Sequence, residues 1–448
     1  MCTANAGEAI KPANDPASNL FVDDIDTDWQ DEAFKTGNIQ EHTVGLSGGT
    51  EAAKYYVSLN YFDHNGTVAG KGPSYQRYSF RINTDFKEGR FRFGESFAYA
   101  KVNQRFMTFM HTGNILQYIV NAIPTLPVYD STTRDGYSNA SQTLHGSYTA
   151  NAIGFNNVLD SRTERFRFIG NAYGEVELAS WLKYKLSLSY ERTDWKDFYF
   201  EPIHDLGWFY VNNIAKLNDW RGSGNTSTIE NTLSFDKTFD RHAMQAVIGH
   251  SILESNVSRS FGHAEGFSQP YFPVLSNGTS GISVTGDEFK NRLVSYFGRV
   301  NYQYDDRFLL TATIRRDGSS RFSPDNRWGN FPSLAVGWKL HNEPFLKSVL
   351  PESVTALKFR ASYGELGNQE IGDYQFQAYI NSYAHAVFGN QQALGATQTT
   401  FAVPDIKWES KISRNIGLDM EFFRRLSLSV EYYENVGQDI LLRVQIPG

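Results

Sequence analysis

From about residue 43 to residue 433 the chain repeats one pattern, in which every second side chain is aromatic or aliphatic and the intervening ones are small or polar. Near the C-terminal end, Leu428 and Val430 alternate in this way with Ser427 and Ser429. Successive side chains of a β-strand point to opposite faces of its sheet. The repeat therefore predicts strands that have one apolar face and one polar face.

The connections between these segments alternate in length. Short turns at one end of a sheet and long loops at the other are typical of an outer-membrane β-barrel. A soluble β-sandwich has the same period-two strands, but it has no reason to collect all its long loops at one end. The sequence therefore predicts an all-β fold, a transmembrane antiparallel up-and-down β-barrel with about fourteen strands visible. The predicted strands are 41–48, 53–62, 75–86, 90–101, 163–178, 182–194, 225–238, 242–255, 289–304, 308–317, 331–341, 355–364, 410–423 and 425–435. The short turns are predicted at 87–89, 179–181, 240–241 and 305–306, and the long loops at 102–162, 195–224, 256–288 and 365–409.

Composition fits a barrel wall and argues against other classes. Aromatic residues make up 15% of the chain, which suits a lipid-facing band with aromatic girdles. The mean hydropathy of −0.44 is compatible with this, because the lumen face and the loops of a barrel are polar. The longest apolar stretch, residues 115–123, ends at Pro124, and we expect a short helix inside a long loop there. A net charge of −7 without a basic run argues against a nucleic-acid partner.

The sequence contains no convincing catalytic or metal-binding constellation. Residues 45–49 fit the G-x-S-x-G pattern of a nucleophile elbow, but a strand follows where that elbow needs a helix, so a glycine-rich hairpin turn is the better interpretation. Asp24, Asp26 and Asp28 imitate the start of a calcium loop that lacks its required Gly and Glu. The ten histidines show no zinc-binding spacing. We therefore predict neither an enzyme nor a bound metal or cofactor.

The ends of the chain lead us to expect an internal part of a longer barrel protein. Residues 1–19 have neither a basic start nor an apolar core of the secretory type. Residues 441–448 do not close the chain with an aromatic-ended strand. We expect residues 1–38 to lead into the barrel and residues 39–448 to form part of its wall.

Several motifs together resemble the barrel of the SusC/RagA family of TonB-dependent outer-membrane transporters, and the resemblance covers nearly the whole chain. The most specific motif runs from Arg316, Asp317 and Gly318 through Ser319, Ser320, Arg321 and Phe322 to Asn326, Arg327, Trp328 and Gly329, with Phe331, Pro332, Ser333, Gly337 and Trp338 after it. Further stretches that resemble the family are 27–32, 36–37, 47–50, 124–130, 357–364, 367–369 and 415–419.

This resemblance implies a 22-stranded barrel with a plug domain inside it. It also implies a SusD-like surface lipoprotein over the mouth, import of oligosaccharides or peptides, and energy supplied through the TonB complex. The location implied is the outer membrane of a Gram-negative bacterium, with lipid around the wall. On the same basis we expect the plug domain, the TonB box and the C-terminal strands of the barrel to lie outside these 448 residues.

Substrate-binding residues are expected in the long loops and near the outer rim. Trp208, Tyr210 and Trp220 in the predicted 195–224 loop are our candidates for contact with the substrate or the lid. The charged motif residues are expected to be structural, with Asp317, Arg321, Arg327 and their neighbours holding a turn through charge-assisted hydrogen bonds. The sequence does not separate a glycan from a peptide substrate. The alternative function is a β-rich surface protein or adhesin that binds glycans without transporting them.

Overall fold

The computed structural model describes residues 12–18, 20–107, 109–110, 113–146, 149–207, 210–269 and 271–442. Fourteen strands form one antiparallel sheet in the order β1-β2-β3-β4-β7-β8-β11-β12-β13-β14-β15-β16-β19-β20, so each strand pairs with its neighbours in the chain. The fourteen predicted strands and their up-and-down order are confirmed. Their bounds are β1 (Asn38–Gly49), β2 (Ala53–Asn65), β3 (Ser74–Glu88), β4 (Phe91–Arg105), β7 (Asp160–Ala179), β8 (Leu182–Glu201), β11 (Lys216–Phe239), β12 (His242–Glu265), β13 (Ser280–Tyr304), β14 (Phe308–Ser319), β15 (Trp328–Lys339), β16 (Val354–Asn368), β19 (Glu409–Phe422) and β20 (Leu426–Gln438).

The remaining elements are short and lie in the connections. Within the described ranges, no helix combines the length and the apolar character that crossing a membrane requires. The helices are α1 (Trp29–Ala33), α2 (Ile115–Asn121), α3 (Ala152–Val158) and α4 (Pro344–Lys347), with 3-10 turns η1 (Pro12–Asn14), η2 (Leu275–Asn277), η3 (Pro324–Asn326) and η4 (Leu340–Asn342). The minor strands are β5 (Phe109–Met110), β6 (Gly113–Asn114), β9 (His204–Asp205), β10 (Val211–Asn212), β17 (Ile380–Phe388) and β18 (Gln391–Gln398).

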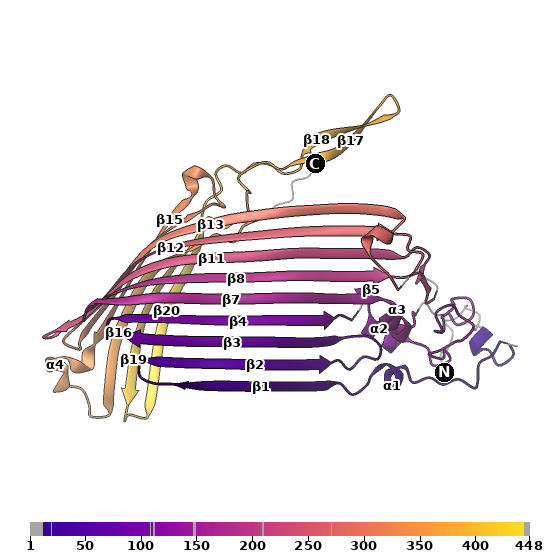
Figure 1. The fold of residues 1–448 in the computed structure, drawn as a ribbon. Helices are drawn as coiled ribbons and strands as arrows, with labels where there is room; N and C mark the ends of the chain where they lie inside the picture. Colours follow the sequence, from indigo (N-terminus) through magenta and orange to yellow (C-terminus); the bar gives the residue numbers. More distant parts are fainter. Residues whose placement is uncertain are drawn as a thin grey trace.

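The sheet is a strongly curved wall. In Figure 1 the indigo strands β1–β4 run across the view, whereas β16, β19 and β20 stand steeply near their left-hand ends. The tight turns lie at one end of the wall, and the loop helices α2 and α3 lie at the other. Asp240, Asp305 and Asp306 take left-handed conformations in two of these turns, with φ of 52°, 51° and 51°. Short aspartate side chains tolerate that conformation because they hydrogen-bond locally.

Two predicted loops are shorter than expected, because their strands continue. β8 runs to Glu201 and β11 begins at Lys216, so the loop predicted at 195–224 is reduced to 202–215. In the same way the loop predicted at 256–288 is reduced to 266–279. On these extensions the face that carries apolar side chains elsewhere also carries polar ones, as at Arg221 and Ser223 of β11. The alternation of apolar and polar residues fades there, because a strand that extends beyond the apolar band no longer needs an apolar face.

The two faces of the sheet differ in chemistry along its whole width. One face, called here the apolar face, carries exposed side chains such as Leu59, Leu188 and Leu428. The opposite, polar face carries hydrogen bonds that cross from strand to strand. The Asn171 amide donates to Ser187 and Ser189 at 3.0 and 2.7 Å. Other polar-face contacts are Asn60 with Glu41 and Thr43, Asn83 with Ser96, Arg167 with Glu191, Arg315 with Ser295, and Arg360 with Asp419 and Glu431.

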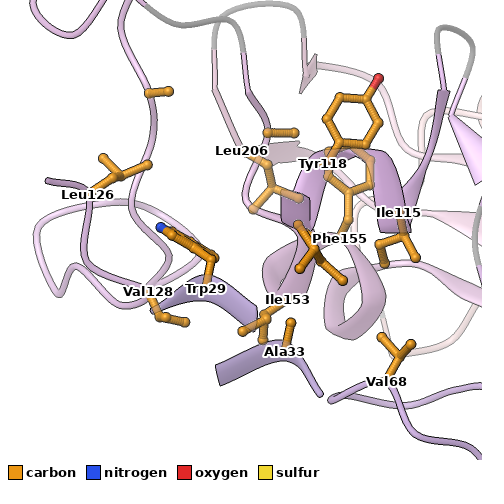
Figure 2. Packing of buried hydrophobic residues seen from close by; sticks show 14 of the residues in the cluster. Trp29, Ala33, Val68, Ile115, Tyr118, Leu126, Val128, Ile153, Phe155 and Leu206 are labelled. Atoms are coloured by element: carbon orange, nitrogen blue, oxygen red, sulfur yellow. The ribbon is translucent and has the colours of Figure 1, made fainter. Parts of the chain in front are cut away.

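A folded cap occupies the long-loop end of the wall near β1–β8. Its core, the cap cluster, draws on α1, α2, α3 and the connection after β8 (Figure 2). The helix expected at 115–123 is confirmed as α2, and it places Ile115 and Ile119 in this core. Trp29 donates its indole N–H to the Ile123 carbonyl at 2.9 Å. The segment before β1 is therefore part of the cap. The cap cluster consists of Trp29, Ala33, Val68, Ile115, Tyr118, Ile119, Leu126, Val128, Ala140, Ala150, Ala152, Ile153, Phe155, Leu159 and Leu206.

Candidate ligand-binding surface on the polar face

A hollow of about 510 Å³ opens on the sheet toward the long-loop end, over β8, β11, β12 and β13. Strand pairing arranges its polar-face side chains in two rows that cross the sheet. The first row is Arg165, Trp195, Gly222, Arg259 and Asp287, each opposite the next on the neighbouring strand. The second row lies two residues closer to the long-loop end on each strand. It consists of Thr163, Asp197, Trp220, Phe261 and Thr285.

The hollow lies far along the strands from the short turns. Trp195 lies on β8, 14 residues after Trp181 in the short turn that precedes this strand. At ~3.3 Å per residue and a ~45° tilt, its height above that turn is ~33 Å. The apolar band of a barrel is only ~25 Å tall. The rows therefore stand above the height of such a band, toward the long-loop end of the wall.

The floor of the hollow is the indole of Trp195, which lies over Gly222. A Cβ atom at Gly222 would lie 2.2 Å from Cζ2 of Trp195, so only glycine leaves room for the ring. At Gly224 a Cβ would meet Trp195 only at 3.8 Å, an ordinary contact. The Gly222 position thus allows a large aromatic side chain of one strand to lie across the next strand.

Two side-chain pairs flank this floor. The Trp220 and Phe261 rings stack with centroids 4.9 Å apart and an interplanar angle of 29°. Arg259 donates two hydrogen bonds to Asp287, at 2.8 and 3.1 Å, and its guanidinium lies 4.8 Å from the centre of the Phe289 ring. A bidentate pair of this kind is rigid and charge-balanced. The hollow therefore combines aromatic surface with fixed donors and acceptors.

A second, smaller hollow adjoins the first and shares Asp197 and Trp220 with it. Thr163 donates its hydroxyl to Asp197 there. Arg165 also lines this second hollow, and its side chain is exposed. The two hollows together make a continuous surface from β7 to β13. No group of three or more potential metal-ligating side chains occurs among the described residues.

The three candidate residues for substrate contact fall in different places. Trp208 lies outside the described residues. Tyr210 packs against the cap cluster, and its hydroxyl donates to that of Tyr118 at 2.7 Å. Its ring meets Phe155 edge to face at 5.3 Å. Trp220 belongs to β11 rather than to a loop, and 39% of its surface is exposed in the hollow.

Sequence reasoning missed Trp195, Phe261 and Arg259, although they surround Trp220. The signal that identifies them is the pairing register, since residues distant in the chain share a row only when their strands are aligned. Arg259 and Asp287 are 28 residues apart in sequence, yet they form two hydrogen bonds. Alternation alone would only have placed them on the polar face.

The family motif lies at the connection between β14 and β15, away from the hollow. Asp317 accepts two hydrogen bonds from Arg315, at 2.9 and 2.7 Å. Arg321 reaches out of the turn and pairs with Asp373 at 2.9 Å. The Arg327 carbonyl accepts the indole N–H of Trp408 at 2.9 Å. The motif therefore connects its own turn to the following long loop.

The remaining motif residues allow close packing at the same connection. The guanidinium of Arg316 lies 5.1 Å from the Trp328 ring centre. A Cβ at Gly318 would lie 2.9 Å from the Trp328 ring, and one at Gly329 would lie 2.4 Å from that of Phe331. Asn326 closes the 3-10 turn η3, and its N–H donates to the Ser323 carbonyl at 3.1 Å.

A substitution at Gly222 tests the floor of the hollow. Gly222→Val is expected to displace the Trp195 indole and to change the tryptophan emission of the full-length protein, because the new Cβ occupies the ring's position. Gly224→Val is the matched control, with room for a Cβ on the same strand and face. The emission change should disappear in a Trp195→Phe background. A change of equal size at both glycines would contradict this geometry.

The curved up-and-down sheet, with its apolar face, its polar face and its turns of two lengths, defines the wall of an outer-membrane β-barrel. A family model described as "TonB dependent receptor-like, beta-barrel" matches residues 111–448. The chain belongs to this family of TonB-dependent receptors, and the resemblance found in the sequence is confirmed.

Curated relatives support the same assignment. The chain is 31% identical over 441 residues to TonB-dependent receptor P3 of Formosa agariphila. This alignment covers 96% of this chain and 43% of that relative. It is 30% identical over 461 residues to TonB-dependent receptor SusC of Bacteroides thetaiotaomicron, covering 94% of this chain and 43% of SusC. The chain thus spans less than half the length of these relatives.

Solved structures show the same fold. The structure of the RagAB peptide transporter matches with a TM-score of 0.79 at 23% identity, over 97% of this chain and 49% of that one. The siderophore receptor PirA from Acinetobacter baumannii matches with a TM-score of 0.53 at 14% identity, over 91% of this chain and 52% of that one. At these identities the likeness concerns the fold alone.

Proposed function

We propose that the chain forms part of the wall of an outer-membrane transporter that imports oligosaccharides or peptides into a Gram-negative bacterium. A SusD-like lipoprotein covers its mouth, and the TonB complex supplies the energy. The observation that carries this proposal is the hollow around Trp195 and Trp220, on the polar face and at the loop end of the wall. In a barrel that face lines the lumen, so the hollow lies on the entry path.

The relatives support the proposal from a second side. One relative is named SusC, and the RagAB structure is described as that of a peptide transporter. A surface protein that binds glycans without moving them is the alternative, and the hollow alone would serve either role. The apolar face favours the transporter, because its leucine and aromatic side chains are exposed over the width of the sheet and suit contact with lipid.

Uptake by cells that carry the full-length protein tests this function. Labelled oligosaccharides and peptides should enter cells with an intact TonB complex, and uptake should cease when TonB is deleted while surface binding remains. The physical reason is that binding uses the wall and loops, whereas release into the periplasm needs external work. Binding without uptake in both strains would establish the glycan-binding alternative, and uptake that persists without TonB would establish a passive pore.

Purification tests the partner separately. The full-length protein, extracted in mild detergent, is expected to retain a lipoprotein of the SusD type. Removing the loop between β16 and β19 is expected to weaken that association, because the β17–β18 hairpin within it presents exposed apolar side chains such as Val387, Phe388 and Leu394. A protein that purifies alone, with all its loops intact, would contradict this part of the proposal.

A further inference from the structure

We infer that the hollow recognises an acidic oligosaccharide, with a sugar ring on the Trp195 indole and the acidic group of that sugar on Arg165. The inference rests on the proposed function and names the substrate class for the same site. It follows from three features of the polar face: a half-buried indole that lines the hollow, a cation without a side-chain partner beside it, and a floor whose strands are paired on both sides.

Arg165 is the cation without a partner. Two other arginines of the polar face near the hollow are held by carboxylates, Arg167 by Glu191 at 2.6 Å and Arg259 by Asp287 at 2.8 Å. The Arg165 side chain forms no hydrogen bond or ion pair with any described residue, and it is exposed. A guanidinium presents a planar fork that matches a carboxylate or a sulfate ester.

The place of Arg165 ties this charge to the hollow. It lies directly opposite Trp195 in the pairing of β7 with β8, and it lines the second hollow with Asp197 and Trp220. Directly opposite residues have Cβ atoms ~5 Å apart. A ligand whose ring rests on the indole therefore has its acidic substituent within reach of the guanidinium.

The neighbouring groups suit the hydroxyls of a sugar. Asp197 offers carboxylate oxygens to hydroxyl donors, and Thr285 offers a hydroxyl at the other end of its row. The Arg259–Asp287 pair is already charge-balanced and adds fixed donors and acceptors without attracting a second net charge. The apolar face of a pyranose ring can lie on the indole, as aromatic surfaces accept flat apolar faces.

The backbone argues against a peptide ligand here. Extended peptides commonly bind by adding a strand to a free sheet edge. At the Trp195 floor β8, β11 and β12 are each paired on both sides, so their N–H and C=O groups are used within the sheet. Residues 280–292 of β13 pair only with β12 among the strands of this sheet, but that edge lies at the far end of the row from Arg165. A peptide on the Trp195 floor, within reach of Arg165, would have to bind through side chains alone, while its own backbone groups stayed unpaired at a cost.

Binding to the full-length protein in detergent tests the inference. The probes are oligogalacturonates, which carry carboxylates, sulfated carrageenan oligosaccharides, and neutral malto-oligosaccharides of equal length, with affinity measured by calorimetry. Arg165→Gln should weaken binding of an acidic probe about tenfold or more, as expected for a lost charge-assisted contact. Binding of the neutral probe should change by less than about twofold. Arg165→Lys should retain part of the affinity, because it keeps the charge and loses the fork.

Arg167→Gln is the matched control, since Arg167 lies two residues away on the same strand and face but is already paired with Glu191. Trp195→Ala should weaken acidic and neutral probes alike. Preference for the carboxylated or for the sulfated probe tells which anion the site takes. Equal losses in Arg165→Gln and Arg167→Gln, no binding of either acidic probe, or tighter binding of acidic peptides would overturn the inference.

Uptake separates this inference from the proposed function. If TonB-dependent uptake occurs but is insensitive to Arg165→Gln for every acidic probe, the acidic-sugar site is wrong and the transporter stands. If acidic oligosaccharides bind through Arg165 but never enter cells, the site stands and transport is wrong.

Discussion

Replacing Phe322 by alanine is expected to destabilise the full-length protein by about 3–5 kcal/mol, the usual cost of deleting a fully buried aromatic side chain. Phe322 has no exposed surface, and its ring centre lies 5.1 Å from that of Trp408. Trp408 in turn meets Phe331 at 5.2 Å. The substitution removes the centre of a small cluster that joins the β14–β15 connection to the loop after β16.

The measurement is unfolding of the reconstituted protein in urea, together with limited proteolysis of the loop at 369–408. The loss of packing should also expose that loop to cleavage. Phe345→Ala is the control, because Phe345 is 60% exposed in the connection between β15 and β16. It should change stability by less than about 0.5 kcal/mol. Equal effects at the two positions would show that this cluster does not hold the loop.

The strands could be predicted because their signal is local. Fourteen segments were placed from side-chain alternation, and all fourteen occur, since a wall with lipid on one face must repeat with a period of two. The extents of the long strands could not be predicted in the same way. β11 begins at Lys216 rather than near 225, because outside the apolar band the chain forms the same ladder with polar residues on both faces.

The candidate site was only partly predictable, because it depends on register. The sequence predicts Trp220 as a loop aromatic, yet it lies in the hollow as part of a strand. Trp195 and Arg165 are 30 residues apart in sequence and become neighbours only when β7 pairs with β8. Alternation along one strand shows which face of the sheet a side chain occupies. It does not show which residue of the neighbouring strand lies opposite, because that depends on how the strands pair.

The charged motif shows the same limit. Asp317, Arg321 and Arg327 were expected to hold one turn through their own charges. In the structure Arg321 instead contacts Asp373, 52 residues away, and Arg327 contributes its carbonyl to Trp408. The partners of this local motif thus lie in the loop between β16 and β19, where the sequence has no regular pattern. These partners can therefore be identified only from the fold.

Arginine at Leu188 is expected to destabilise the full-length barrel by about 2–4 kcal/mol, whereas arginine at Ser189 should cost less than about 1 kcal/mol. Leu188 is 47% exposed on the apolar face. With the rise per residue and the tilt of a barrel strand, it lies ~16 Å above the short turn, which is near the bilayer midplane. Ser189 lies on the polar face, where it accepts a hydrogen bond from Asn171 at 2.7 Å. An arginine there can extend into the aqueous lumen.

Leu428 and Ser429 offer the same contrast on β20, at the far edge of the sheet, so the two pairs test the face assignment from strand to strand. Because side chains alternate with a period of two, a register error of one residue would exchange the faces and reverse both results. Urea unfolding of the four reconstituted variants decides between the faces. Equal losses within each pair, or a larger loss at the serines, would mean that the leucine face packs against protein, and the membrane wall would have to be replaced by a soluble sheet packed on a second layer.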